Sequence, residues 1–238
     1  MKFKSNKTVI IIPTYNERGN IGKLITKIFN VLSDAKVVVV DDSPNTDTLN
    51  EVRKISKKYP FLEIITRKHK GGRGSAVITG FAYALKKFNV DFLIEMDADF
   101  SHDPGELMSI LNSSGPENIV VASRYISGSK IINWPIERRI ASKISNLLVR
   151  IILGIPLHDN TNGYRCYPKK AVKSLLSKKF LSSGHIVLSE SAYLLMRDGY
   201  HFVEVPSVFH NRMVGRSNAN ILEFLKAFVD LLRIRLRR

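Results

Sequence analysis

The chain alternates short runs of branched apolar residues with longer amphipathic stretches. Residues 8–12 and 37–40 are short runs rich in Val and Ile, and residues 20–32 between them carry apolar side chains at helical spacing. The same alternation predicts further helices at 46–58 and 74–88 and further strands at 62–65, 92–96 and 119–122. Buried strands separated by helices predict an α/β fold with a mainly parallel central sheet flanked by helices.

The second half of the chain is less regular. We expect helices at 135–153, from about 168 and at 188–197, a strand at 202–205 and a loop at 158–165. No repeat or low-complexity linker divides the sequence, so residues 1–238 are expected to form one domain.

The last stretch, 219–238, is strongly amphipathic when drawn as a helix. Glu223, Lys226, Asp230 and Arg233 fall on one stripe and leave a broad apolar face. Such a helix either packs on the core of its own domain or lies in the interface of an anionic membrane.

Composition narrows the class of protein. With 238 residues and 44% apolar residues the chain can bury a substantial core, and its single cysteine, Cys166, excludes an intrachain disulfide and fits a reducing compartment. The sequence lacks a run of eighteen uncharged apolar residues and the pattern of a signal peptide. We therefore expect a cytoplasmic protein without a transmembrane helix.

The net charge of +16, from 37 basic and 21 acidic residues, suggests a polyanionic partner such as nucleic acid, anionic lipid or a phosphorylated substrate. A generally lysine-rich surface would also account for much of it. The basic residues gather in two places, at 130–150 and in the arginines that end the chain.

Carboxylates follow two of the expected strands. Asp41 and Asp42 come after 37–40, and Asp97 and Asp99 come after 92–96. Carboxyl ends of parallel strands meet at one edge of a sheet, and paired carboxylates suit Mg²⁺ or Mn²⁺ carrying a nucleotide diphosphate. The alternatives are a solvated acidic turn or a phosphatase nucleophile motif, although the latter normally follows the first strand and here follows the fourth.

Together with other motifs, this acidic pattern resembles the family 2 glycosyltransferases of the GT-A fold, and within them the dolichyl-phosphate mannose synthases and related polyprenyl-phosphate glycosyltransferases. The resemblance covers nearly the whole chain. It rests on Pro13-Thr14-Tyr15-Asn16-Glu17, Gly72-Arg73-Gly74-Ser75-Ala76, Met96-Asp97-Ala98-Asp99-Phe100-Ser101-His102, Ser123-Arg124-Tyr125, residues 159–165 and Arg212-Met213-Val214-Gly215-Arg216-Ser217.

The resemblance implies roles for individual residues. The nucleotide would be bound by Pro13, Tyr15, Glu17, Asp41, Asp42, Lys68 and Asp97. Asp97 and Asp99 would hold Mg²⁺ or Mn²⁺, with Ser101 where relatives have a Gln. Asp99, Arg124 and Arg212 would be catalytic, Arg139, Ser142 and Arg216 would bind the acceptor phosphate, and Glu190 would contact the sugar.

Several of these positions have a structural alternative. Asp42 could cap a helix, Arg139 could belong to a basic surface, and Asp159 could act as a base or merely organise its loop. The glycine-rich segment 70–76 matches no phosphate-loop pattern and is typical of a flexible helix start, although Arg73 could line the nucleotide pocket.

The expected function is metal-dependent, inverting transfer of a hexose, mannose or glucose, from GDP-mannose or UDP-glucose to dolichyl or polyprenyl phosphate. Residues 1–125 would bind the nucleotide sugar and 126–218 the acceptor, with 219–238 at the cytoplasmic face of the membrane, with or without a membrane-protein partner. A soluble, glycan or protein acceptor is the alternative. A nucleic-acid binder would fit the charge but would leave the placed carboxylates unexplained, so nucleic acid is not an expected partner.

Overall fold

A seven-stranded sheet organises the part of the chain that the structure describes. The structure is a computed structural model that describes residues 5–68, 70–182, 186–211 and 221–237, with only the backbone described for 221–225. The strand order is β3-β2-β1-β4-β7-β5-β8, and every neighbouring pair is parallel except those made by β7. The strands are β1 (Thr8–Thr14), β2 (Lys36–Asp41), β3 (Leu62–Thr66), β4 (Phe92–Glu95), β5 (Asn118–Ser123), β7 (Arg165–Pro168) and β8 (His201–Pro206).

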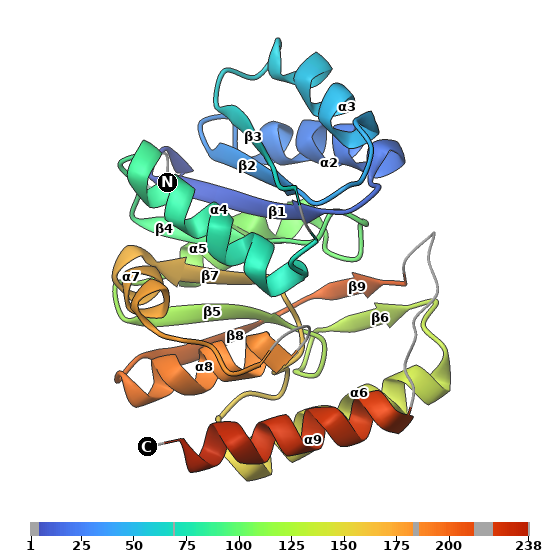
Figure 1. Cartoon of the computed structure of the whole chain (residues 1–238), viewed down its shortest axis with the longest axis vertical. Helices are drawn as coiled ribbons and strands as arrows, with labels where there is room; N and C mark the ends of the chain where they lie inside the picture. The colour runs from blue at the N-terminus through green and yellow to red at the C-terminus, as the bar shows by residue number, and fades with distance from the viewer. Residues whose placement is uncertain (1–4, 69, 183–185, 212–220, 238) are drawn as a thin grey trace.

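Helices cover both faces of this sheet (Figure 1). Val9 and Ile11 of β1 point to one face and Ile10 and Ile12 to the other, because side chains alternate along a strand. One face is covered by α2 (Arg18–Val31), α3 (Asp47–Ser56) and α5 (Leu107–Ser113), which follows the 3₁₀ turn η1 (Pro104–Glu106). The other is covered by α4 (Arg73–Lys87), α7 (Lys169–Ser177) and α8 (Val187–Arg197).

The α/β architecture with a mainly parallel sheet is as the sequence predicts, but the second half differs in detail. The helix expected from about 168 is found as α7, but the expected loop through residue 165 runs into a strand that the sequence reasoning missed, since Arg165–Pro168 form β7. β7 runs antiparallel between β4 and β5 and brings the preceding loop to the edge where the acidic residues lie. A small two-stranded sheet of β6 (Lys130–Ile132) and β9 (Val208–His210) was also unforeseen.

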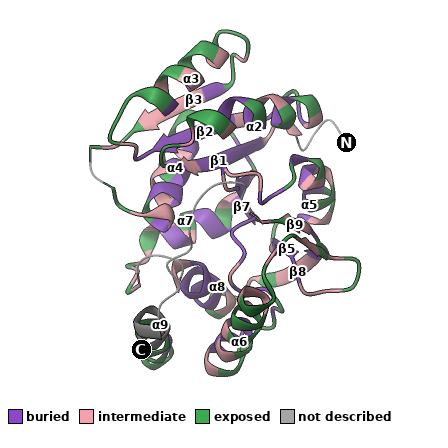
Figure 2. Cartoon of the chain, turned by 90° about the vertical axis from the view of Figure 1, so that its right-hand side faces the viewer, coloured by how far each residue is buried: buried purple, intermediate pink, exposed green. Residues whose placement is uncertain are grey.

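Two amphipathic helices pack against each other at the end of the molecule opposite α3 (Figures 1 and 2). They are α6 (Ile136–Leu153) and α9 (Ile221–Leu236). Leu231 and Ile234 of α9 are buried in the core, whereas Phe228 and Leu232 are exposed. Packing of this helix on its own domain, one of the two sequence-based alternatives, is thus found in the structure, and its place at a membrane stays a prediction. Within the described residues, no helix is long and apolar enough to cross a membrane.

Candidate active site

Acidic side chains meet at the edge of the sheet where its parallel strands end. Asp41 is the last residue of β2, and Asp97 and Asp99 come just after β4. Only β1 separates β2 from β4, so the two acidic segments are close neighbours. Ligands of open α/β sheets bind at this edge. The convergence of carboxylates that the sequence predicts is thus found in the structure.

At the end of β2, Asp41 is buried and held by hydroxyl groups. Its Oδ1 atom accepts hydrogen bonds from Thr14 Oγ1 at 2.8 Å and Ser43 Oγ at 2.6 Å. Tyr15, just beyond β1, is 42% exposed, and the Lys70 ammonium lies 3.7 Å from the centroid of its ring. An exposed ring beside a fixed carboxylate offers a stacking surface and a hydrogen-bond acceptor, which are the groups that a nucleoside needs.

The neighbouring Asp42 forms a bidentate ion pair with Arg67. Arg67 Nε and Nη2 each lie 2.6 Å from a carboxylate oxygen of Asp42, and the Gly71 amide donates to the same carboxylate at 3.2 Å. The cap alternative for Asp42 is wrong, since Thr46 precedes the first residue of α3. Sequence reasoning missed Arg67, whose partner lies twenty-five positions away.

Three further predicted nucleotide contacts surround this region. Pro13 lies in β1 opposite Val40 of β2. Glu17 immediately precedes α2, and its carboxylate accepts a hydrogen bond from Asn20 Nδ2 at 2.9 Å. Lys68 is exposed in the segment that follows β3.

The turn after β4 fixes both of its aspartates. Asp97 Oδ1 accepts from Arg73 Nε at 2.6 Å. Asp99 Oδ1 accepts from the hydroxyl and the amide of Ser101, at 2.6 and 3.0 Å, and Phe100 between them has a φ of 60°. The Ser101 hydroxyl thus orients Asp99.

The side chains at this turn supply only some of the oxygen ligands that Mg²⁺ or Mn²⁺ requires. Among the described residues, no group of three or more His, Cys, Asp or Glu side chains could hold an ion. Asp97 and Asp99 would therefore supply a minority of the ligands. Mg²⁺ is commonly bound by one or two carboxylates, with water and substrate phosphates completing its shell, so the residues present fit an ion that arrives with a diphosphate.

His102 holds the same turn through a hydrogen bond to its backbone. Its Nδ1 atom accepts a hydrogen bond from the Asp97 amide at 3.1 Å, so Nε2 carries the proton and donates to Asn162 Oδ1 at 2.7 Å. Burial lowers the pKa of His102, and the nearby Asp97 and Asp99 carboxylates offset this only in part. The imidazole is therefore neutral at pH 7, and its two hydrogen bonds connect the turn with the loop before β7.

Arg124, at the end of β5, is committed to a buried ion pair. Its Nε and Nη2 atoms lie 2.7 Å from the two oxygens of Asp159, and its amide donates to Asp159 at 3.0 Å. Burial alone would raise the pKa of Asp159, but the Arg124 guanidinium outweighs it and holds this pKa below its ordinary value. Because the amides of Thr161 and Asn162 also donate to this carboxylate, the pair organises the loop, as the non-catalytic alternative for Asp159 expects.

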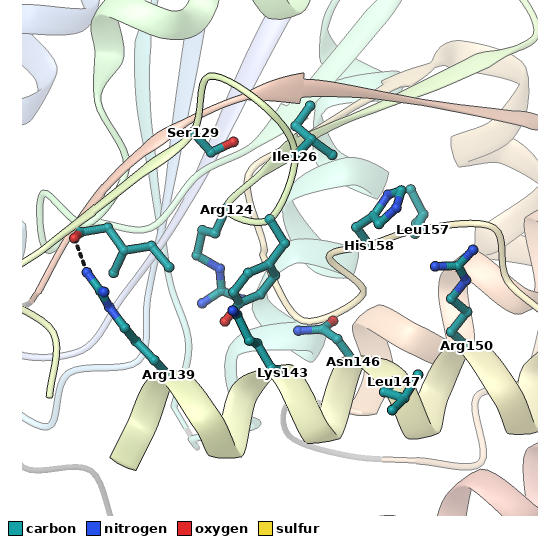
Figure 3. A pocket seen from close by; sticks show the side chains of 12 residues that line it. Arg124, Ile126, Ser129, Arg139, Lys143, Asn146, Leu147, Arg150, Leu157 and His158 are labelled. Carbon is teal, nitrogen blue, oxygen red and sulfur yellow. Dashed lines mark hydrogen bonds between the residues drawn. The ribbon is translucent and has the colours of Figure 1, made fainter. Parts of the chain in front are cut away.

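A pocket of about 470 Å³ opens beside Arg124, between α6 and the loop after β5 (Figure 3). Arg139, Lys143 and Arg150 rise into it from α6, and their spacing of four and seven residues places them on one helix face. His158 lines its far wall. No Asp or Glu occurs among the residues that line this pocket in the described chain. Sequence reasoning gave a binding role to Arg139, counted Lys143 and Arg150 only among the basic residues of 130–150, and gave no role to His158. The helix face that Arg139, Lys143 and Arg150 share could have indicated the first two.

Two donors buried at this pocket are unsatisfied. Arg139 donates through Nη2 to the carbonyl of Ile131, but its Nε atom and the hydroxyl of Tyr125 have no hydrogen-bond partner in the described part of the chain. Ser142 lies one turn further along α6, where its carbonyl accepts from Asn146 Nδ2 at 2.9 Å. Buried donors without an acceptor are costly, and at a ligand site they point to an acceptor supplied by the ligand.

The other residues with a predicted role lie elsewhere. Glu190 of α8 is fully buried, and its carboxylate accepts from the amides of Leu181 and Ser182 at 2.7 and 2.8 Å. Arg237, the residue after α9, has its Nη1 atom 3.4 Å from the same carboxylate. Glu190 therefore connects the loop at 181–182 with the segment that follows α9. Arg212 and Arg216 lie outside the described residues.

Residues 9–176 match the family model described as glycosyl transferase family 2. The chain belongs to glycosyltransferase family 2. The resemblance drawn from the motifs is confirmed, and the protein is a glycosyltransferase. The matched range contains the acidic edge, Arg124 and the pocket on α6.

Named family members are similar over most of the chain. A polyprenol monophosphomannose synthase of Mycolicibacterium smegmatis is 32% identical over 224 residues, which are 92% of this chain and 84% of that protein. An undecaprenyl-phosphate mannosyltransferase of Micrococcus luteus is 33% identical, covering 89% of this chain and 86% of that protein. A dolichol-phosphate mannosyltransferase of Pyrococcus furiosus is 33% identical over 95% of this chain, which spans 64% of its length.

Solved structures support the fold. A glucosyl-3-phosphoglycerate synthase from Mycobacterium tuberculosis, in complex with Mn²⁺, UDP and glucosyl-3-phosphoglycerate, superposes with a TM-score of 0.64 at 16% identity. The superposition covers 98% of this chain and 81% of that one. The predicted GT-A fold is confirmed.

Proposed function

We propose that this family 2 glycosyltransferase moves a hexose, with inversion, from a nucleotide-diphosphate sugar to polyprenyl or dolichyl phosphate at a membrane surface, with Mg²⁺ or Mn²⁺. Three relatives that cover most of the chain are named for mannosyl transfer to lipid phosphates. Mannose from GDP-mannose is therefore the favoured donor sugar, with glucose from UDP-glucose as the alternative.

The observation that carries the proposal is the pair of buried, unpartnered donors in a basic pocket. Tyr125 Oη and Arg139 Nε both lack an acceptor in the described chain. Lys143 and Arg150 add positive charge from the same helix. A phosphate monoester supplies both the acceptor oxygens and the negative charge that such a pocket requires.

The chemistry needs little from a general base. The second pKa of a phosphate monoester is about 6, so much of the acceptor is already a dianion at pH 7 and can attack the sugar without losing a proton. This fits Asp159, whose carboxylate is engaged with Arg124. The task of the protein is to hold two anions in line. The pocket on α6 would hold the acceptor phosphate, and the turn at Asp97 and Asp99 would hold the donor diphosphate.

The donor would lie along the acidic edge of the sheet. Tyr15, Asp41 and Asp42 would contact the nucleoside, and Asp97 and Asp99 would bind the diphosphate through the ion. The ion, when bound, would neutralise the charge that grows on the leaving diphosphate. Glu190, given its buried contacts, would influence the sugar through the loop that it holds.

A membrane is the proposed source of the acceptor. Five large apolar residues of α6 are 46–69% exposed, namely Ile136, Ile140, Ile144, Leu147 and Ile151. Leu147 also lines the basic pocket, so the pocket opens next to this apolar stripe. The stripe would enter the interface at the cytoplasmic face, and the neighbouring arginines and lysines would meet anionic headgroups.

A thermal-shift experiment tests the donor site. GDP and UDP are added with and without Mn²⁺ to the wild-type chain and to Asp99→Ala. We expect one nucleotide to raise the Tm of the wild type in a manner that needs Mn²⁺, and the variant to lose that increase. Equal shifts in both proteins would remove Asp99 from the metal site.

A transfer assay tests the acceptor. GDP-mannose and UDP-glucose are each incubated with polyprenyl phosphate, with simple sugars and with a protein acceptor. We expect product only on polyprenyl phosphate. Transfer to a soluble or protein acceptor in its place would favour the alternative function, and no transfer to the lipid phosphate would contradict the proposal.

A further inference from the structure

Arg73, the first residue of α4, joins three acceptors from distant parts of the chain. Its guanidinium donates to Asp97 Oδ1 and to Glu95 Oε2, each at 2.6 Å, and to the carbonyl of Gly163 at 2.9 Å. An arginine fork with three acceptors in fixed directions has little freedom to rotate. The bridge therefore connects α4, β4 and the loop before β7 at the acidic edge.

The carboxylate of Glu95 is held as firmly on its other side. Its Oε1 atom accepts from the hydroxyl of Tyr167 in β7 at 2.5 Å, and Glu95 is 2% exposed. A guanidinium group is charged at every pH at which proteins fold, and that of Arg73 lies 2.6 Å from the carboxylates of both Glu95 and Asp97. Glu95 thus anchors a permanent cation beside Asp97.

This arrangement changes what Asp97 can offer to a ligand. One of its two oxygens is already engaged, and part of its negative charge is neutralised before any ion arrives. Glu95, Asp97 and Asp99 place three carboxylates within five residues, and Arg73 is bonded to two of them. Without this cation, the acidic edge would attract a divalent ion more strongly but would repel a diphosphate.

We propose that Arg73 is a positioning residue that orients Asp97 and limits the negative charge of the turn, so that the donor diphosphate binds together with its ion rather than after tight binding of the bare ion. This inference rests on the proposed function of the acidic edge as the metal and diphosphate site. It gives Arg73, which follows Gly71 and Gly72, a role that the glycine-rich pattern of 70–76 alone did not indicate.

Two opposite substitutions test the inference. Arg73→Met removes the cation, and Glu95→Gln leaves Arg73 in place but removes the Glu95 carboxylate, which competes with Asp97 for the guanidinium. Binding of Mn²⁺ alone and of GDP or UDP with saturating Mn²⁺ is measured by titration calorimetry, with Tm as the check on folding. Exposed Arg53→Met in α3 is the matched control.

We expect Arg73→Met to bind Mn²⁺ alone about tenfold more tightly and the nucleotide at least tenfold more weakly, and Glu95→Gln to weaken binding of Mn²⁺ alone. Arg73→Lys, which keeps the charge but not the fork, should keep the Mn²⁺ affinity of the wild type and weaken nucleotide binding. Arg53→Met should match the wild type in both.

The sign of the two Mn²⁺ effects decides the matter. A merely structural bridge would weaken Mn²⁺ binding in both variants, or lower Tm with ligand affinities unchanged, and either result would overturn the inference. If Arg73→Met does not fold, unchanged or tighter Mn²⁺ binding by Glu95→Gln would also overturn it. Failure of the wild type itself to bind any nucleotide with Mn²⁺ would instead refute the proposed function.

Discussion

Gly163 lies so close to Arg73 that a Cβ atom at position 163 would stand 2.0 Å from Arg73 Nη2. Gly163→Ala should therefore displace the guanidinium and break its bond to the carbonyl at 163. Overpacking of this kind typically costs about 1–3 kcal/mol, and we expect a lower midpoint of urea unfolding together with weaker nucleotide binding. Gly19→Ala is the control, because a Cβ there meets nothing within 4 Å. A variant at 163 that matched the wild type in both measurements would contradict the close contact.

The ion pair of Arg124 and Asp159 should make the free energy of unfolding depend on pH in the acid range. Asp159→Asn leaves a buried guanidinium unpaired and should cost about 3–5 kcal/mol at pH 7. The pKa of Asp159 is lowered by folding, so the unfolded chain binds the proton first and the stabilisation is lost as pH falls from the ordinary value of 3.8 toward the lower folded value. Urea unfolding at pH 7 and at pH 3 measures this.

We expect the gap between wild type and Asp159→Asn to shrink at pH 3. Asp91→Asn, at an exposed position, should show no comparable gap at either pH. A gap that stayed constant with pH would mean that the carboxylate charge of Asp159 does not stabilise the fold.

Tyr125→Phe removes one of the unsatisfied donors. Because its hydroxyl has no partner in the described chain, the variant should be at least as stable as the wild type. If the hydroxyl donates to the acceptor phosphate, KM for polyprenyl phosphate should rise about tenfold, the value of one hydrogen bond to a charged group. KM for the donor should not change. The control is Tyr83→Phe, which removes a hydroxyl that donates to Glu63, and an unchanged acceptor KM in Tyr125→Phe would exclude the contact.

The apolar stripe of α6 should govern attachment to vesicles. Ile140→Ser and Ile151→Ser each remove a large exposed side chain that would become buried in the interface, a change of about 1.5–3 kcal/mol at full burial. Co-sedimentation with vesicles containing an anionic lipid should fall about tenfold for each, with Tm retained. Phe61→Ser, an exposed aromatic residue just before β3 at the other end of the molecule, should bind as the wild type does. Equal loss in all three variants would argue against a specific face.

Sequence patterns revealed the parallel half of the fold because β1, β2, β4 and β5 are apolar on both faces. They did not reveal β7, which has four residues, begins with Arg165 and ends with a proline. Arg165 can be buried there because the carbonyls of Asn160, Asn162 and Leu188 accept from its guanidinium. Tertiary structure brings those acceptors to Arg165, so no local sequence pattern predicts a buried strand there.

The same limit applies to the site. Asp97 and Asp99 could be recognised because both stand in one short motif after a strand. The partners that hold them could not, since Arg73 is twenty-four positions from Asp97 and the Gly163 carbonyl is ninety positions from Arg73. Residue type and spacing pointed to candidate ligand-binding groups, and long-range contacts supply the orientation of their side chains.

The antiparallel insertion of β7 has a consequence for the order in which the protein can become functional during synthesis. The first 125 residues contain the acidic edge, yet Asn162, Gly163 and Tyr167 supply partners for His102, Arg73 and Glu95. A nascent chain released from the ribosome before β7 would carry the aspartates without the contacts that hold them. The proposed donor site is therefore expected to form only after residues 162–168 have been synthesised and β7 has paired with β4 and β5. An N-terminal fragment that lacks these residues should not form the site.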